Sequence, residues 1–92
     1  MNAPLQRKVI LIAGAGRGAG PATARQLAAQ GHHVVLGGQG SRRMQGLVSE
    51  IREAGGSAEW FKLDANVPEE MSEFLAFGED VFKRVDVVIN NA

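Results

Sequence analysis

The sequence contains no cysteine, no net charge and no long apolar run. Without cysteine, a disulfide framework and a cysteine-based zinc site are excluded. Ten lysines and arginines balance ten aspartates and glutamates, whereas proteins that bind nucleic acid through its phosphates are usually basic. Apolar runs such as residues 9–13 are far shorter than the roughly 20 residues that cross a membrane. We therefore expect neither a nucleic-acid nor a membrane partner.

The amino-terminal residues 1–8 carry a little positive charge, but no apolar region long enough for a signal peptide follows them. Together with the lack of cysteine, this favours a cytoplasmic protein. His32 and His33 are adjacent, so on a strand they would point to opposite faces and could not share a metal ion. We expect no metal site.

Short apolar runs separated by glycine-rich turns predict four strands, at residues 9–13, 33–37, 58–63 and 85–89. Three segments between them have helical spacing. The first covers residues 22–30. The second has Ser41 as its expected N-cap and an apolar face of Met44, Leu47, Val48, Ile51 and Ala54. The third begins at Pro68, with an apolar face of Met71, Phe74, Leu75, Val81 and Phe82.

This βαβαβαβ alternation indicates a parallel sheet with right-handed crossovers. The expected fold class is α/β, a Rossmann-type three-layer αβα arrangement with strand order 3-2-1-4. Residues 1–92 would then form one truncated, nucleotide-binding domain, the first half of a doubly wound fold plus one strand. Ligands of such sheets bind at the carboxyl ends of the strands, at the switch point between the first and fourth strands.

A glycine-rich loop, residues 14–20, follows the first predicted strand and opens the first helix. In that context, glycines let the backbone approach a pyrophosphate, and the N–H groups of the helix N-terminus point at it. The alternative is a tight turn that binds no ligand. The residues fit two spacings: G-x-G-x-x-A from Gly14 to Ala19, and G-x-x-x-G-x-G from Gly14 to Gly20.

The second spacing resembles the short-chain dehydrogenase/reductase family. Asp64 after the third strand resembles the family's adenine-contacting aspartate, and Asn90-Asn91-Ala92 resembles the start of its Asn-Asn-Ala-Gly motif. The resemblance covers nearly all of the chain and implies a dinucleotide cofactor, NADP or NAD. The implied cofactor-binding residues are Gly14, Gly16, Arg17, Gly18, Ala19, Gly20, Gln39, Arg42, Asp64, Ala65, Asn90 and Ala92.

The chain departs from the family pattern in the loop and in its catalytic residues. The family usually has Thr at the position of Ala13, a larger apolar residue at Ala19 and a residue other than proline at Pro21. Its catalytic Ser and its Tyr-x-x-x-Lys pair lie beyond residue 92, and this chain contains no tyrosine. Full-length relatives transfer hydride between a nicotinamide and an alcohol or carbonyl; we expect this chain not to be catalytic alone.

The second predicted strand ends without the acid that would bind the ribose of NAD, since residues 37–40 are Gly-Gly-Gln-Gly. Arginines nearby instead accommodate the 2′-phosphate of NADP. Arg17 lies in the loop, where NADP-preferring members of the family often carry a basic residue, and Arg42 and Arg43 follow the strand. Gln39 is neutral where those members often have arginine. We predict a preference for NADP(H) over NAD(H).

Two other functions fit the sequence. The chain could be a binding or interaction module that kept the fold without the chemistry, or a methyltransferase, although methyltransferases usually carry an acid at the end of the second strand. Residues 87–89 would form a long, apolar sheet edge, and such edges recruit partners. The expected partner is a second copy, through self-association or domain swapping, or a complementary C-terminal half.

Several residues have a simpler structural interpretation. Asp64 could merely cap a loop, and Asn90 could be a brace at the strand end. Gly78 could mark close packing or a weak point in its helix. We expect Trp60 and Phe61 to be core or sheet-face residues. The acidic residues of the third helix are expected to form a solvated face: Glu69, Glu70, Glu73, Glu79 and Asp80.

Overall fold

The computed structural model describes residues 7–91, and the expectations placed on the first six residues and on Ala92 lie outside that range. Strands and helices alternate as the sequence predicts. In chain order they are β1 (Val9–Ala13), α1 (Gly20–Ala29), β2 (His33–Gly38), α2 (Ser41–Glu53), β3 (Ser57–Lys62), α3 (Pro68–Phe82) and β4 (Val87–Asn90).

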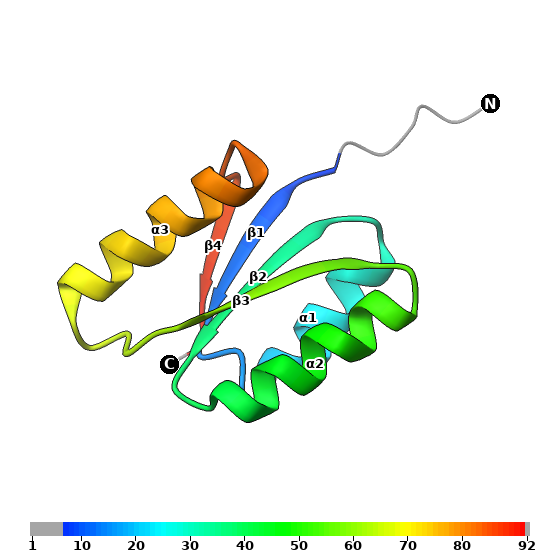
Figure 1. Ribbon diagram of the computed structural model, residues 1–92, viewed down its shortest axis with the longest axis horizontal. Coiled ribbons are helices and arrows are strands. Elements are labelled where there is room, and N and C mark those ends of the chain that lie inside the picture. The colour runs from blue at the N-terminus through cyan, green and yellow to red at the C-terminus, as the bar shows by residue number, and fades with distance from the viewer. Residues whose placement is uncertain (1–6, 92) are drawn as a thin grey trace.

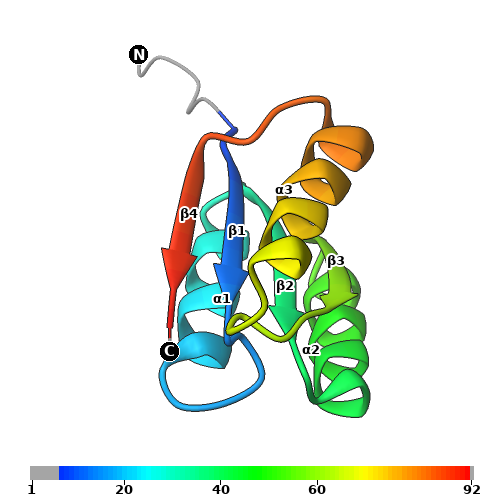
Figure 2. The ribbon, with the colours of Figure 1, turned by 90° about the vertical axis from the view of Figure 1, so that its left-hand side faces the viewer.

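The four strands form one parallel sheet in the order β3-β2-β1-β4, which confirms the predicted topology. Helices α1 and α2 cover one face of the sheet and α3 covers the other, so the chain has three layers (Figures 1 and 2). At the carboxyl end of β1, Ala13 pairs with Gly37 on one side and with Asn90 on the other. The segments that follow these strands are thereby brought to the same edge of the sheet.

The core consists of two apolar clusters separated by the sheet. Strand β1 is buried on both faces, which explains its unbroken apolar run. Toward α1 and α2 lie Ile10, Ile12, Val34, Leu36 and the apolar face of α2. Toward α3 lie Val9, Leu11, Val35, Leu63 and Phe74. Among residues 7–91, no helix is long and apolar enough to cross a membrane.

Helix α3 packs closely on β1 through Gly78. A Cβ atom at this position would lie 2.8 Å from Leu11 Cδ1, so Gly78 marks close packing rather than a weak point. Phe74 is fully buried, as predicted for the apolar face. The prediction that Val81 belongs to that face is wrong: one residue before the end of the helix, it is 37% exposed and belongs to neither core cluster of the described residues.

Two predicted element starts are wrong. Ser41 is the first residue of α2 and not its N-cap; Gly40 takes that position, and no side chain caps the helix. The reason is the tight turn before it, in which Ser41 N–H donates to Gln39 O at 3.0 Å. Similarly, α1 begins at Gly20 rather than residue 22, with Pro21 in its first turn. Ala54 follows α2 as its C-cap and is exposed.

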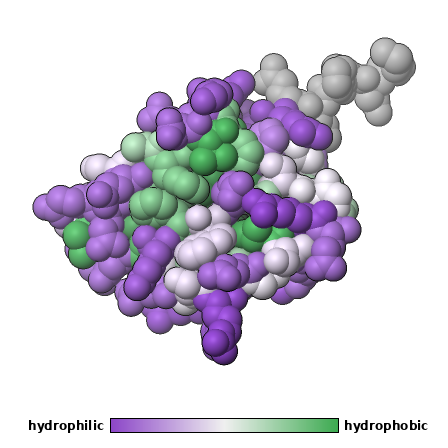
Figure 3. All heavy atoms as spheres, in the orientation of Figure 1, coloured by the Kyte–Doolittle hydropathy of each residue, from purple (hydrophilic) through white to green (hydrophobic). Residues whose placement is uncertain are grey.

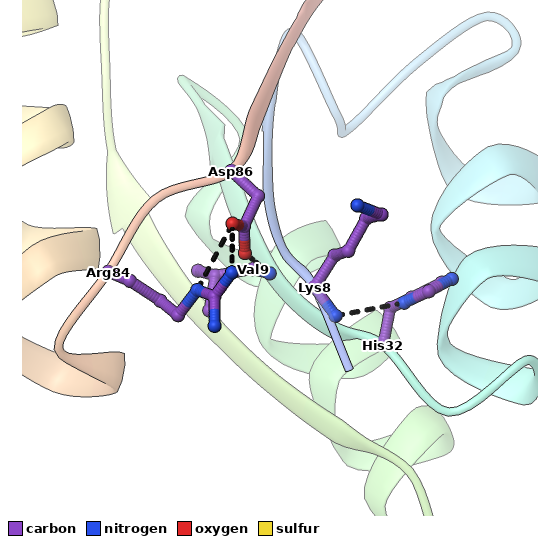
Figure 4. Close-up of polar contacts among 5 residues, drawn as sticks. All are labelled: Lys8, Val9, His32, Arg84 and Asp86. Carbon is purple, nitrogen blue, oxygen red and sulfur yellow. Dashed lines mark hydrogen bonds and ion pairs between the residues drawn. The ribbon is translucent and has the colours of Figure 1, made fainter. Parts of the chain in front are cut away.

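Strand β4 begins two residues later than predicted because Asp86 binds β1 through its side chain. Its Oδ2 accepts the N–H of Val9 at 2.8 Å, and its Oδ1 accepts Arg84 Nη2 at 2.6 Å (Figure 4). These hydrogen bonds, that of Arg84 first and that of Val9 second, lower the pKa of the Asp86 carboxyl. The backbone N–H of Asp86 also donates to Val9 O at 2.9 Å, so the backbone and the side chain of Asp86 together fasten the approach to β4 against the start of β1.

On the side of β1 that faces β2, a histidine side chain forms a hydrogen bond to the residue just before β1. Lys8 N–H donates to His32 Nδ1 at 3.1 Å (Figure 4). The His33 Nδ1 lies 2.7 Å from Ser57 Oγ, and its ring stacks on Phe82 with centroids 4.4 Å apart. Burial lowers the pKa of His33 below its ordinary value, and the positive charges of Arg7 and His32 lower it further.

Gly46 lies in the middle of α2, and a Cβ atom added to it would meet no other part of the described chain within 4 Å beyond the helix's own backbone. We expect Gly46→Ala to stabilise the fold by about 0.5–1 kcal/mol, since alanine loses less backbone entropy in a helix. Gly37→Ala is the contrasting variant: its Cβ would lie 2.7 Å from Phe74 Cζ, an overpacking that costs about 1–3 kcal/mol. Urea unfolding midpoints measure both. Equal midpoints for the two variants would contradict the packing described for β2 and α3.

Because the pKa of His33 is lowered in the folded chain, the unfolded chain binds the proton more readily. The free energy of unfolding should be constant above pH about 6.5 and should fall as the pH drops below that value. We expect His33→Gln to flatten this decline, and His32→Gln, which leaves the Ser57 and Phe82 contacts in place, to retain it. Unfolding curves between pH about 7.5 and about 5.5 measure the slopes on both sides of the ordinary histidine pKa. An unchanged slope in His33→Gln would contradict the assignment.

Candidate nucleotide site

A hollow of about 550 Å³ lies at the carboxyl ends of the strands, within the size range of small-molecule sites. It occupies the switch point at which strand order reverses between β1 and β4. Three loops line it, those after β1, β2 and β3, together with the end of β4. The lining residues are Gly14, Gly16, Arg17, Gly38, Gln39, Gly40, Arg43, Leu63, Asp64, Ala65, Asn66, Asn90 and Asn91.

The backbone conformation of the glycine loop shows which of the two glycine spacings in its sequence the structure requires. Gly14 and Gly18 have φ angles of +75° and +61°, which side chains rarely adopt. A Cβ at Gly20 would lie 2.8 Å from Ala15 Cα. At Gly16, by contrast, φ is not positive and the nearest atom would be 3.9 Å away. The backbone therefore requires glycine in the G-x-x-x-G-x-G pattern.

Asn91 fixes the shape of this loop. Its Nδ2 donates to Gly14 O at 3.1 Å and to Arg17 O at 3.0 Å, and its N–H donates to Ala13 O at 2.9 Å. A Cβ at Gly14 would lie 2.3 Å from Asn91 O, so the two backbones touch. The sequence interpretation assigned the brace to Asn90; this was wrong, because within residues 7–91 the hydrogen bonds to the loop come from Asn91. Asn90 lines the same hollow, but the structure gives its side chain no hydrogen bond to the loop within residues 7–91.

The N-terminus of α1 opens beside the loop without a cap. Ala19 occupies the N-cap position and makes no side-chain hydrogen bond, and the first turn contains no acid. The first N–H groups of a helix have no partner within it, and their positive dipole favours an anion. Backbone groups of this kind, at the edge of a hollow, fit a phosphate.

The third loop places Asp64 in the wall of the hollow. Its Oδ1 accepts the N–H of Asn66 at 2.9 Å, so the capping interpretation of Asp64 is confirmed. For Oδ2 the structure gives no hydrogen bond within residues 7–91, and this oxygen is available to a ligand. The Asp64 N–H donates to Glu70 Oε1 at 2.8 Å. Assigning Glu70 to a solvated helix face was therefore wrong; its position in the first turn of α3 was the one signal that could have indicated this bond.

The structure brings seven of the twelve predicted cofactor residues to the hollow: Gly14, Gly16, Arg17, Gln39, Asp64, Ala65 and Asn90. Four do not line it. Gly18, Ala19 and Gly20 shape the turn that leads into α1, and Arg42 lies on an exposed part of α2. Ala92 is outside the described residues. Arg43 takes a place in the wall that Arg42 does not, because neighbouring residues of a helix point about 100° apart.

The aromatic residues of β3 lie away from the hollow. Trp60 packs against the cluster beneath α1 and α2. Phe61 packs on the other face, with its ring centroid 5.9 Å from that of Phe74 and 5.1 Å from that of Phe77. Apolar side chains gather on this side of the molecule beside α3 (Figure 3). Both residues are packed on the sheet faces, as predicted.

Comparison with known proteins agrees with this geometry. The chain is 37% identical over 87 residues to the short-chain reductase protein NovJ of Streptomyces niveus, covering 95% of this chain and 33% of that protein. An alcohol dehydrogenase from the archaeon Thermococcus sibiricus, solved with 5-hydroxy-NADP, has a TM-score of 0.84 and 36% identity over 90% of this chain and 36% of its own. An NADH-dependent reductase solved with NAD has a TM-score of 0.85 and 36% identity over 96% of this chain and 37% of its own.

The chain thus spans about a third of the length of the relatives that it matches. Their common part is the sheet and the loops that enclose the hollow. The family description of the short chain dehydrogenases matches residues 8–92, which is nearly the whole sequence. With this match, the glycine spacing and the sheet order, the chain belongs to the short-chain dehydrogenase family.

Proposed function

We propose that this chain binds a nicotinamide dinucleotide in the hollow and is the cofactor-binding portion of an oxidoreductase. The observation that carries the proposal is that the glycine loop lines the hollow through Gly14, Gly16 and Arg17 and leads directly into the N-terminus of α1, for which no side-chain cap is found within residues 7–91. Two structural neighbours were solved with 5-hydroxy-NADP and with NAD, which supports a ligand of this class.

In this proposal, different residues bind different parts of the dinucleotide. The backbone N–H groups of residues 16–19, to which the structure gives no acceptor within residues 7–91, hold the pyrophosphate. Asp64 and Ala65 hold the adenine, with Asp64 Oδ2 as the acceptor. Asn90 and, outside the described residues, Ala92 border the ribose and nicotinamide end. When bound, the oxidised cofactor would take up a hydride from an alcohol, and the reduced cofactor would supply one to a carbonyl.

The chain's own residues would bind and orient the cofactor without completing the reaction. The family's general acid/base is a tyrosine, and the 92 residues contain none. Lys83 and Ser72 do not supply a substitute, since Lys83 Nζ donates to Asp80 O at the end of α3 and Ser72 lies on its exposed face. Hydride transfer would therefore require the Ser and Tyr-x-x-x-Lys residues from outside this sequence.

We further propose that the site prefers NADP(H) to NAD(H). Arg17 and Arg43 both line the hollow together with Gln39, and the end of β2 carries no acid to repel a 2′-phosphate. Arg43 is the better placed of the two arginines after β2, and Arg42 adds positive charge nearby. Arginine binds phosphate through paired N–H donors, so the pair can replace the arginine that is missing at Gln39.

Titration with NADPH and NADH, followed by energy transfer from Trp60 to the nicotinamide, should give tighter binding of NADPH. Arg43→Ala should weaken NADPH binding by about tenfold, the loss of one charged hydrogen bond, and should leave NADH binding nearly unchanged. Arg42→Ala is the matched control and should weaken NADPH binding far less. Gly18→Val, strained at a positive φ, should abolish binding of both, whereas Gly46→Ala, in α2 and away from the hollow, should retain it. Equal affinity for the two cofactors, or tighter NADH, contradicts the preference.

A second candidate is an interaction module, or one subunit of a split enzyme, that assembles through β4. Within residues 7–91 this strand pairs only with β1, and Val87 and Val88 are 38% and 42% exposed. The strand has four residues, so the predicted edge is apolar but short. Its unpaired backbone groups suit either a second copy of the chain or a complementary C-terminal half.

Light scattering at high concentration should show dimers or larger species of the chain alone. Val88→Lys places a charge on the exposed edge and should shift the chain toward monomer, whereas Val81→Lys, exposed on α3, should leave the distribution unchanged. A sharp monomer mass for the unaltered chain would count against self-association through β4.

A further inference from the structure

Glu70 lies in the first turn of α3 and does not line the hollow, yet it holds part of the hollow's wall. Its Oε1 accepts the N–H of Asp64 at 2.8 Å. We propose that Glu70 is a positioning residue: through this hydrogen bond it fixes the Asp64–Asn66 segment and thereby sets the affinity for the adenine end of the dinucleotide. The ligand part of this inference rests on the proposed function.

The hydrogen bonds of the loop after β3 show why one side chain has this effect. The loop is anchored at its start, where Leu63 N–H donates to Gly38 O at 2.8 Å. Beyond this point the bonds are internal: Asn66 N–H to Asp64 Oδ1 at 2.9 Å and Val67 N–H to Asp64 O at 3.0 Å. Within the described part of the chain, Glu70 supplies the one side-chain hydrogen bond that reaches residues 64–66 from another element; Ala65 also packs against the apolar cluster between α3 and the sheet. Without Glu70, that apolar contact and the internal bonds would remain, but the Asp64 N–H would lose its acceptor and the segment its polar tie to α3.

The bond is directed at the loop rather than at the helix. Val67 is the N-cap of α3 and has no side-chain cap, and Glu70 is the third helical residue. An acid at that position usually binds back to the N-cap N–H in a capping box. Here it reaches three residues further upstream, to Asp64. Its charge strengthens the bond and is favourable at a helix N-terminus, so α3 holds the loop rigidly.

The chain contains a matched control one residue away. Glu69 is also acidic, lies in the same helical turn and is exposed, and the structure gives its carboxylate no hydrogen bond within residues 7–91. Removing Glu69 or Glu70 changes the net charge and the helix dipole equally. A difference between the two variants therefore reports the contact with Asp64.

The experiment compares Glu70→Ala, Glu70→Gln and Glu69→Ala in the 92-residue chain. Amide hydrogen exchange of Asp64 is measured by NMR, and binding is measured for NADPH, for adenosine 2′,5′-bisphosphate and for reduced nicotinamide mononucleotide. Glu70→Ala should expose the Asp64 amide and weaken NADPH and the adenosine bisphosphate by about tenfold. Binding of the mononucleotide, which has no adenine, should not change. Glu70→Gln keeps an acceptor oxygen and should lose about threefold or less, and Glu69→Ala should match the unaltered chain.

Urea unfolding of each variant separates positioning from loss of the fold. Unchanged Asp64 exchange in Glu70→Ala overturns the proposal, as does faster exchange without a selective loss of the two adenine ligands. Equal losses for Glu69→Ala and Glu70→Ala also overturn it, because they would reflect charge alone. If the unaltered chain binds none of the three ligands, the proposed function fails and the ligand part of the inference fails with it, while Asp64 exchange still reports whether Glu70 holds the loop.

Discussion

The close approach of the glycine loop to the end of β4 governs the geometry of the site. Gly14 and Asn91 are in backbone contact, and the Asn91 amide holds two carbonyls of the loop. This contact is possible only because β1 pairs with β4, which places residues 77 apart in sequence at one edge of the sheet. The shape of the glycine loop therefore depends on the pairing of β1 with β4, and the site on the sheet order.

The hollow that results is built mostly from backbone. The glycines supply space and N–H groups, α1 supplies the positive end of a helix dipole, and side chains contribute chiefly through Arg17, Arg43 and Asp64. A site of this kind is suited to phosphates, because it offers many donors with little flexibility.

The polar groups at the two ends of the sheet differ in how many of them have hydrogen-bond partners. At the amino ends of the strands, Asp86, Arg84, His32 and His33 form fixed polar contacts that join β1 to β4 and β2 to β3. At the carboxyl ends the polar groups of the loops are left partly without partners within the described part of the chain. Stability and binding are thus separated along the strands, and substitutions at one end can be studied with little direct effect on the other.

The amino-acid sequence by itself determined the element order, the parallel sheet and the position of the glycine loop. The periodicity of strands and helices and the glycines and prolines at their ends are local properties of the sequence, so they can be recognised without knowing the tertiary structure. The sequence could not determine which element boundaries tertiary contacts would move: Asp86 delays β4 by binding Val9, and the turn before α2 draws Ser41 into the helix. Nor could it show that Arg43 rather than Arg42 lines the hollow, or that Asn91 rather than Asn90 holds the loop. Both choices, like the contact between Glu70 and Asp64, depend on the direction in which a side chain leaves its helix or strand, and only the packing of that element against its neighbours decides this direction.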